Sequence, residues 1–129
     1  MNNVFLRLLL TSMLLALTIP AYADSAVQIW HCELEEGKTP ADAEAVSSAW
    51  LKAAKGMKGG DEMVVYLDSP VVASSGGGEF HFVLITPSFG AWGEFNEAYP
   101  GSAAAKADED FAAVASCSGS SLWASKKVE

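Results

Sequence analysis

Basic residues are scarce in this sequence. Beyond Arg7 there is no arginine, and seven lysines stand against sixteen aspartates and glutamates, so residues 24–129 carry a formal net charge of −9. A nucleic-acid-binding surface needs basic side chains that displace phosphate counterions. Anionic lipid headgroups attract basic clusters for a similar reason. The charge balance therefore predicts no nucleic-acid partner and no membrane partner for this acidic region.

The amino terminus has an apolar run, but one too short to cross a bilayer. Residues 8–19 would span ~18 Å as a helix, against ~30 Å for the hydrocarbon core. Arg7 precedes this run, Pro20 ends it, and Ala21 and Ala23 supply the small residues that a signal peptidase reads. We therefore expect the first 23 residues to be a cleavable signal peptide and the protein to be periplasmic or secreted. A retained membrane anchor is the alternative.

Only two cysteines are present, Cys32 and Cys117. We expect residues 24–129 to form one domain in an oxidising compartment, where an even number of cysteines is typical of a disulfide. Such a bond would close a loop of roughly 85 residues and stabilise the domain by ~4 kcal/mol through chain entropy. Two buried free thiols or a metal-binding pair are the alternatives.

Known catalytic and cofactor-binding motifs are missing. Gly76-Gly77-Gly78 does not join a strand to a helix with the spacing of a phosphate-binding loop. The segment around Ser118-Gly119-Ser120 does not match the G-x-S-x-G pattern of a nucleophilic serine. The four tryptophans are typical of core and interface aromatics. We therefore predict no cofactor.

Hydrophobic periodicity and turn residues predict four strands and three helical segments. Thr39 and Pro40 form a helix start, and Gly56 offers a stop. The second strand either ends before Pro70 or continues past it to Val72 as an edge strand. The expected strands are residues 26–34, 63–68, 79–86 and 122–128; the expected helices begin at residues 40, 88 and 103, the last ending at 116; residues 73–78 are expected to form a mobile hairpin loop.

The order of elements is strand, helix, strand, strand, helix, strand. With right-handed crossovers, it predicts a ferredoxin-like α+β fold: an antiparallel sheet in the order 4-1-3-2 with helices on one face. This order, with the helical region that carries Phe89, Trp92 and Phe95, resembles the dimeric α+β barrel superfamily, which includes antibiotic-biosynthesis-monooxygenase-like proteins. The resemblance covers the chain after the signal peptide and implies a homodimer through the open sheet face. No catalytic residue of that family can be placed on a position here.

This topology bears on the cysteines. The first and fourth strands are antiparallel neighbours, so the end of one lies beside the start of the other. Cys32 is near the end of the first strand, and Cys117 comes just before the fourth. A fold deduced without the cysteines therefore brings them together and favours a structural disulfide.

The two histidines fall on one face of the predicted sheet. Alternation puts the more apolar side of the first and third strands, with Cys32, beneath the helices. Pairing these strands so that residue numbers sum to 112 sets His31 opposite His81 and Glu33 opposite Glu79 on the helix-free face. Two residues of the second strand would border them, Tyr66 and Asp68.

Three functions compete with an inert role for this face. The leading one is binding of a small apolar or aromatic ligand between two protomers, with His31, His81, Glu33, Glu79, Tyr66 and Asp68 as candidate contacts. The second is a cofactor-independent monooxygenase-like enzyme with both histidines as acid and base. The third is a zinc or copper site made by the histidines and one or both glutamates. In the inert case, the histidines form hydrogen bonds at the rim or at the dimer contact.

Overall fold

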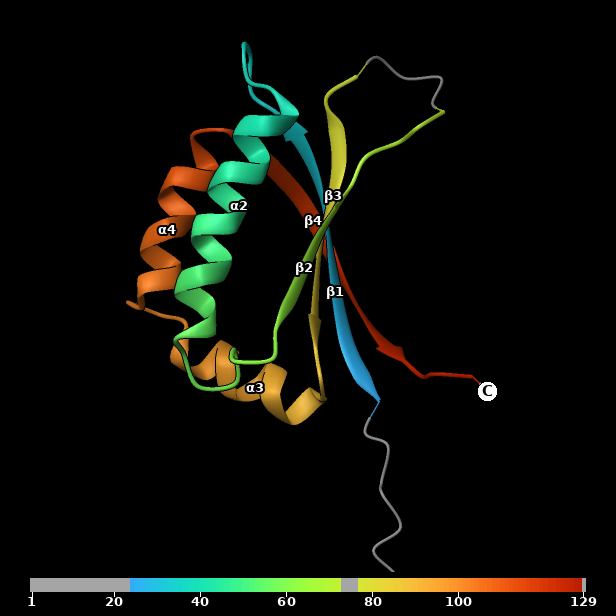
Figure 1. The fold of residues 1–129 in the computed structure, drawn as a ribbon, viewed down its shortest axis with the longest axis vertical. Helices are drawn as coiled ribbons and strands as arrows, with labels where there is room; N and C mark the ends of the chain where they lie inside the picture. The colour runs from blue at the N-terminus through green and yellow to red at the C-terminus, as the bar shows by residue number, and fades with distance from the viewer. Residues whose placement is uncertain (1–23, 73–76, 129) are drawn as a thin grey trace, which may run out of the picture.

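A computed structural model describes residues 24–72 and 77–128. Its strands form one antiparallel sheet in the order β2-β3-β1-β4, which confirms the predicted ferredoxin-like α+β topology. Helices α2 and α4 lie side by side on one face of the sheet, and α3 lies across one end (Figure 1). The elements are β1 (Ser25–Leu34), α2 (Pro40–Lys55), β2 (Val64–Asp68), β3 (Glu79–Thr86), α3 (Phe89–Ala98), α4 (Ala103–Ala112) and β4 (Ala115–Ser125).

Two predictions concern residues outside this description. The expected signal peptide at residues 1–23 lies wholly outside it, and so does most of the hairpin loop expected at residues 73–78. Within the described part of the chain, no helix combines the length and the apolar character that a membrane span requires. Strand β2 ends at Asp68, before Pro70, which decides between the two ends considered for it.

The last strand is longer than the sequence predicted. A helix to residue 116 and a strand from residue 122 were expected, but α4 ends at Ala112 and β4 begins at Ala115. In the interval between the expected helix and the expected strand, the sequence indicated a turn around Gly119. This glycine has φ of +66°, and the ladder shifts register there, because Trp30 pairs with Ser120 while the next residue of β1 pairs with Ser118. Gly119 is therefore the extra residue of a β-bulge, which interrupts the strand without ending it.

Cys32 and Cys117 form the predicted disulfide. They are direct partners in the β1–β4 ladder, with their Cα atoms 4.0 Å apart. Cys117 lies inside β4, two residues after the strand begins, and not ahead of it as predicted. The bond therefore joins an edge strand to the central strand beside it. Free thiols and a metal-binding pair are both ruled out.

Helix α2 begins as its sequence predicts. The Thr39 hydroxyl accepts a hydrogen bond from the Asp42 amide at 3.3 Å, and the Asp42 carboxylate accepts one from the Thr39 amide at 2.8 Å. This reciprocal capping box satisfies two backbone donors at the helix start. The side-chain hydrogen bond with Thr39 is the main cause that lowers the pKa of Asp42.

The core lies between the helices and the sheet and centres on Phe82. Its ring meets those of Trp30, Trp50 and Phe111 edge-to-face, with centroids 5.4–5.8 Å apart. These four rings come from β3, β1, α2 and α4, so a single cluster ties both helices to the two central strands. Edge-to-face pairs of this kind are each worth about 0.5–1.5 kcal/mol beyond the burial of their area.

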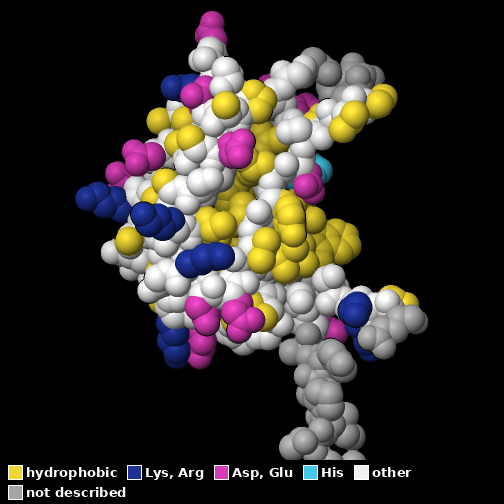
Figure 2. All heavy atoms as spheres, in the orientation of Figure 1, with side chains coloured by type: hydrophobic (Ala, Val, Ile, Leu, Met, Phe, Trp, Pro, Cys, Tyr) yellow, Lys and Arg dark blue, Asp and Glu magenta, His cyan; other side chains and the backbone are white. Residues whose placement is uncertain are grey.

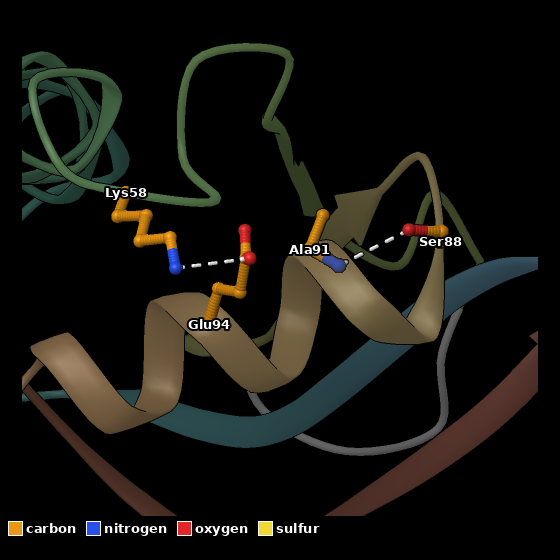
Figure 3. A network of polar contacts seen from close by, with 4 residues as sticks. All are labelled: Lys58, Ser88, Ala91 and Glu94. Atoms are coloured by element: carbon orange, nitrogen blue, oxygen red, sulfur yellow. Dashed lines mark hydrogen bonds and ion pairs between the residues drawn. The ribbon is translucent and has the colours of Figure 1, made fainter.

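Helix α3 is held at its start and along its side. The Ser88 hydroxyl accepts a hydrogen bond from the Ala91 amide at 3.1 Å, and Lys58 Nζ lies 3.1 Å from Glu94 Oε1 (Figure 3). Both charged side chains are largely in solvent, 72% and 48% exposed, and such pairs contribute little. The position of α3 therefore depends on its packing, including that against the segment that follows α2.

Gly59 lets that segment approach α3. Its φ is +78°, and a Cβ atom there would collide with the Ala91 carbonyl oxygen and come within 2.8 Å of the Phe95 amide nitrogen. We expect Gly59→Ala to lower the free energy of unfolding by about 2 kcal/mol or more, because alanine adds a left-handed backbone cost to a steric one. Urea denaturation would measure the change. Gly93→Ala in α3 is the matched control, since a Cβ there meets nothing within 4 Å; equal losses in both variants would contradict the prediction.

Candidate functional site

The helix-free face is the side of the sheet away from α2 and α4, and its register is the predicted one. His31 pairs with His81 and Glu33 with Glu79. Asp68 of β2 pairs with His81 on the other side, so the predicted border residue is in place. The structure thus brings the candidate polar residues together at one end of this face.

The two imidazoles are in contact. Their ring centroids are 4.5 Å apart and their planes are at 85°, an edge-to-face arrangement. Both histidines are exposed, and a row of polar partners crosses the sheet at this level, from Asp68 through His81 and His31 to Ser118. Because the side chains lie in solvent, they are free to meet a second molecule.

The rest of the helix-free face is apolar. One row runs across the sheet from Val64 through Ile85 and Val27 to Trp123, and the next contains Tyr66, Val83 and Ile29. Three of these side chains are large and exposed: Val64 by 40%, Tyr66 by 55% and Trp123 by 58%. Figure 2 shows hydrophobic side chains gathered on this side of the molecule, with a histidine and an acidic side chain at their upper margin. An exposed apolar patch of this kind marks an interaction surface.

The metal site considered from the sequence lacks a complete set of ligands among the described residues. In residues 24–72 and 77–128, no three His, Cys, Asp or Glu side chains are grouped closely enough to hold an ion. His31 and His81 are adjacent, but the neighbouring glutamates do not complete a set with them. A zinc or copper site of the kind considered from the sequence therefore stays a hypothesis.

A second site lies on the other face, between the sheet and the helices. This aromatic cavity has a volume of about 480 Å³. Its aromatic lining is Trp30, Trp50, Phe82, Phe95, Tyr99 and Phe111, and its polar lining is Gln28, Asn96, Asp108 and Ser116. Neither histidine lines it. Small-molecule sites have this character, apolar walls with a few placed polar groups.

Tyr99 is the main polar group on the wall of the aromatic cavity. Its hydroxyl oxygen accepts a hydrogen bond from the Trp50 indole nitrogen at 3.2 Å. Burial raises the pKa of Tyr99, and the negative charge of Asp108 raises it further. The phenol is therefore neutral around neutral pH, and its hydrogen bond to the Asp108 carboxylate contributes to the raised pKa.

A second polar group on the cavity wall, Gln28, is held by hydrogen bonds to two other side chains. The Trp92 indole nitrogen donates to Gln28 Oε1 at 2.9 Å, and Gln28 Nε2 lies 3.5 Å from the Ser120 hydroxyl. The amide oxygen and the amide nitrogen therefore each have one hydrogen-bond partner, and the two together fix the orientation of this side chain. Among the polar residues of the cavity, Tyr99 and Gln28 are thus the two that side-chain hydrogen bonds to tryptophans orient.

Sequence reasoning did not find the aromatic cavity. It assigned the tryptophans to the core and to interfaces, and Trp50 is indeed only 6% exposed. The signal that was available is the recurrence of Phe95 and Tyr99 along α3 and its end, since both side chains line the cavity. An excess of aromatic side chains over the number that a core of this size needs would have indicated a cavity with aromatic walls.

The comparisons with known proteins bear on the fold. No protein-family model matches the chain, and no curated protein matches its sequence. Among solved structures, SnoaB, a cofactor-independent oxygenase from Streptomyces nogalater, is similar with a TM-score of 0.57 at 14% identity, covering 82% of this chain and 97% of that one. A mutant of the same oxygenase matches with a TM-score of 0.53 at 12% identity and the same coverage. These structures therefore share with this chain the fold that the resemblance implies.

Proposed function

We propose that the protein is exported and, as a homodimer, binds a small neutral aromatic ligand. The observation that carries the proposal is the aromatic cavity with its two oriented polar groups. Its volume of about 480 Å³ lies within the range of ~300–1,000 Å³ usual for small-molecule sites. The aromatic side chains of Trp30, Trp50 and Phe111 suit a flat apolar body, while Tyr99 and Gln28 offer polar atoms to one substituent. The carboxylate of Asp108 disfavours an anion.

Naphthol is a suitable probe because it is aromatic, neutral and carries one hydroxyl. We expect it to quench the tryptophan fluorescence in a saturable way, since two tryptophans line the cavity. Ala112→Phe fills the cavity from the end of α4 and should weaken binding at least tenfold, a loss of about 1.4 kcal/mol. Ala113→Phe is the matched control, because this neighbour is equally exposed and does not line the cavity. Equal affinities of the two variants would reject the site.

The proposed dimer uses the helix-free face, with a second copy of the chain as its occupant. Three large hydrophobic side chains are exposed there, and the fold is that of a superfamily of dimers. A two-fold contact would set the apolar rows of one sheet against those of the other. The six residues predicted to bind ligand lie on this face, and their part in ligand binding stays a prediction.

Export is supported by the amino-terminal sequence and by the disulfide. A cysteine pair that is bonded in the folded protein suits an oxidising compartment. Protein recovered from outside the cytoplasm is expected to begin at Asp24, as intact mass and amino-terminal sequencing would show. Replacing Ala21 and Ala23 by lysine should leave the precursor unprocessed. Recovery of full-length protein from the cytoplasm alone would contradict export.

Oxygenation without a cofactor is the second candidate function, favoured by the likeness to SnoaB. A reaction of this class requires a substrate that itself supplies the electrons that reduce oxygen, so dihydroxynaphthalene is the probe, with oxygen uptake as the readout. If His31 and His81 act as acid and base, their double replacement by glutamine should abolish uptake and leave binding intact. Loss of uptake in Tyr99→Phe alone would place the chemistry in the aromatic cavity, and no uptake in the wild type would end this candidate.

A further inference from the structure

A second cavity lies at the opposite end of the molecule from α3, between helix α2 and strands β2 and β3. It has a volume of about 540 Å³, and its apolar wall is mostly aliphatic, with Leu34, Leu51, Val65 and Leu67 joined by the ring of Phe80. In Figure 2, hydrophobic side chains form the floor of the hollow between the helices and the strands. We refer to it as the aliphatic cavity.

One buried hydroxyl in this cavity has no partner. Ser47 is 4% exposed and lines the aliphatic cavity, and its Oγ makes no hydrogen bond within the described part of the chain. A buried hydroxyl without a partner costs free energy, so such groups are usually paired. Ser47 lies on the face of α2 that carries Ala43 and Trp50 into the core, where a non-polar residue would cost less. Its presence there points to a partner that comes from outside the chain.

The charged residues that line the aliphatic cavity determine which charge a ligand there can carry. Glu44 and Glu79 both line the aliphatic cavity, and none of its described lining residues is basic. Carboxylates and phosphates would be repelled by these groups. The rim is also held in place, because the Leu34 amide donates to the Gly78 carbonyl oxygen at 2.9 Å. The cavity therefore suits an uncharged molecule, and the Ser47 hydroxyl, which is closed to solvent, has to turn towards the cavity to meet it.

We propose that the aliphatic cavity binds an uncharged aliphatic alcohol whose hydroxyl pairs with Ser47 Oγ. The aliphatic wall buries the hydrocarbon part of the ligand, and the buried serine supplies the hydrogen bond that fixes its orientation. This site is separate from the aromatic cavity, since no residue lines both. A negative binding result at one cavity therefore does not affect the proposal for the other cavity.

Cyclohexanol tests the proposal in the disulfide-bonded protein, with amide chemical shifts as the readout. We expect saturable shifts at residues that line the aliphatic cavity, among them Ser47 and Leu51. Methylcyclohexane, similar in size but without the hydroxyl, should bind more weakly, and cyclohexanecarboxylate should not bind. Shifts confined to the aromatic cavity, or no saturable shift, would overturn the proposal without touching the naphthol result.

The variant that isolates the hydroxyl is Ser47→Ala. It should unfold at the same temperature as the wild type or higher, because it removes an unpaired buried group, and its affinity for cyclohexanol should fall roughly three- to tenfold. Ser125→Ala is the control, since this exposed serine at the end of β4 lines neither cavity; less than a twofold change is expected. Equal affinities of the two variants would show that Ser47 binds only water and would overturn the proposal. The comparison of cyclohexanol with methylcyclohexane needs no variant, so the test does not depend on how Ser47→Ala folds.

Discussion

Replacing Cys32 and Cys117 together by alanine is expected to lower the free energy of unfolding by about 4 kcal/mol. The bond joins residues 85 apart in sequence, so it closes a long loop in the unfolded chain. Without the bond this loop is open, and the unfolded chain gains conformational entropy. The two residues are already direct partners across β1 and β4, so the native ladder needs no rearrangement to accommodate the bond. Chemical denaturation of both proteins, followed by far-ultraviolet circular dichroism, would measure the difference.

A reducing agent provides the control for the disulfide prediction. It should shift the unfolding midpoint of the wild type towards that of the double alanine variant and leave the variant unchanged. If the two oxidised proteins unfold at the same denaturant concentration, the bond does not contribute as proposed. A variant with a changed denaturant slope would instead indicate a changed unfolded state.

Ile29→Lys is expected to raise the dissociation constant of the proposed dimer roughly a thousandfold, about 4 kcal/mol. Ile29 lies on the central strand β1, in the apolar rows of the helix-free face and opposite Val83. A lysine there would place an unpaired charge on each side of a two-fold contact, where burial of a charge is costly. Sedimentation equilibrium over a range of concentrations would measure the effect.

The control for Ile29→Lys is a charge change of the same sign elsewhere. Glu36→Lys lies in the exposed turn after β1, away from the sheet face, and should leave the association unchanged. Both variants should keep the wild-type circular dichroism, because Ile29 is only partly covered in the single chain. Equal masses for the two variants at every concentration would exclude the helix-free face as the dimer contact.

The sequence allowed the sheet to be predicted in detail because two independent patterns agree. Alternation in β1 and β3 fixed which side chains share a face, and matching apolar and polar positions across the pair fixed the register that sets His31 against His81. A slip by two residues in either direction would have set a histidine against Val83 or Ile29. The disulfide then followed from strand order alone.

The start of β4 could not be predicted in the same way. Ser118-Gly119-Ser120 has the composition of a turn, and only the pairing with β1 shows that Gly119 is accommodated as a bulge. The cavities escaped prediction for a related reason. Their walls come from several elements, so their volumes depend on how well the helices fill the space above the sheet and not on any local pattern.

The bulge at Gly119 has a consequence for how the molecule avoids polymerising. An eleven-residue strand at a sheet margin offers a row of unpaired backbone groups on which another molecule can extend the ladder end to end. The kink at Gly119 breaks that row in two, and Lys126 and Lys127 follow its far end. At the opposite margin, β2 is only five residues long and Pro70 follows it closely. With both margins guarded against growth of a fibre, the broad apolar side of the sheet is left as the surface for the proposed dimer, an association that closes on itself after two molecules.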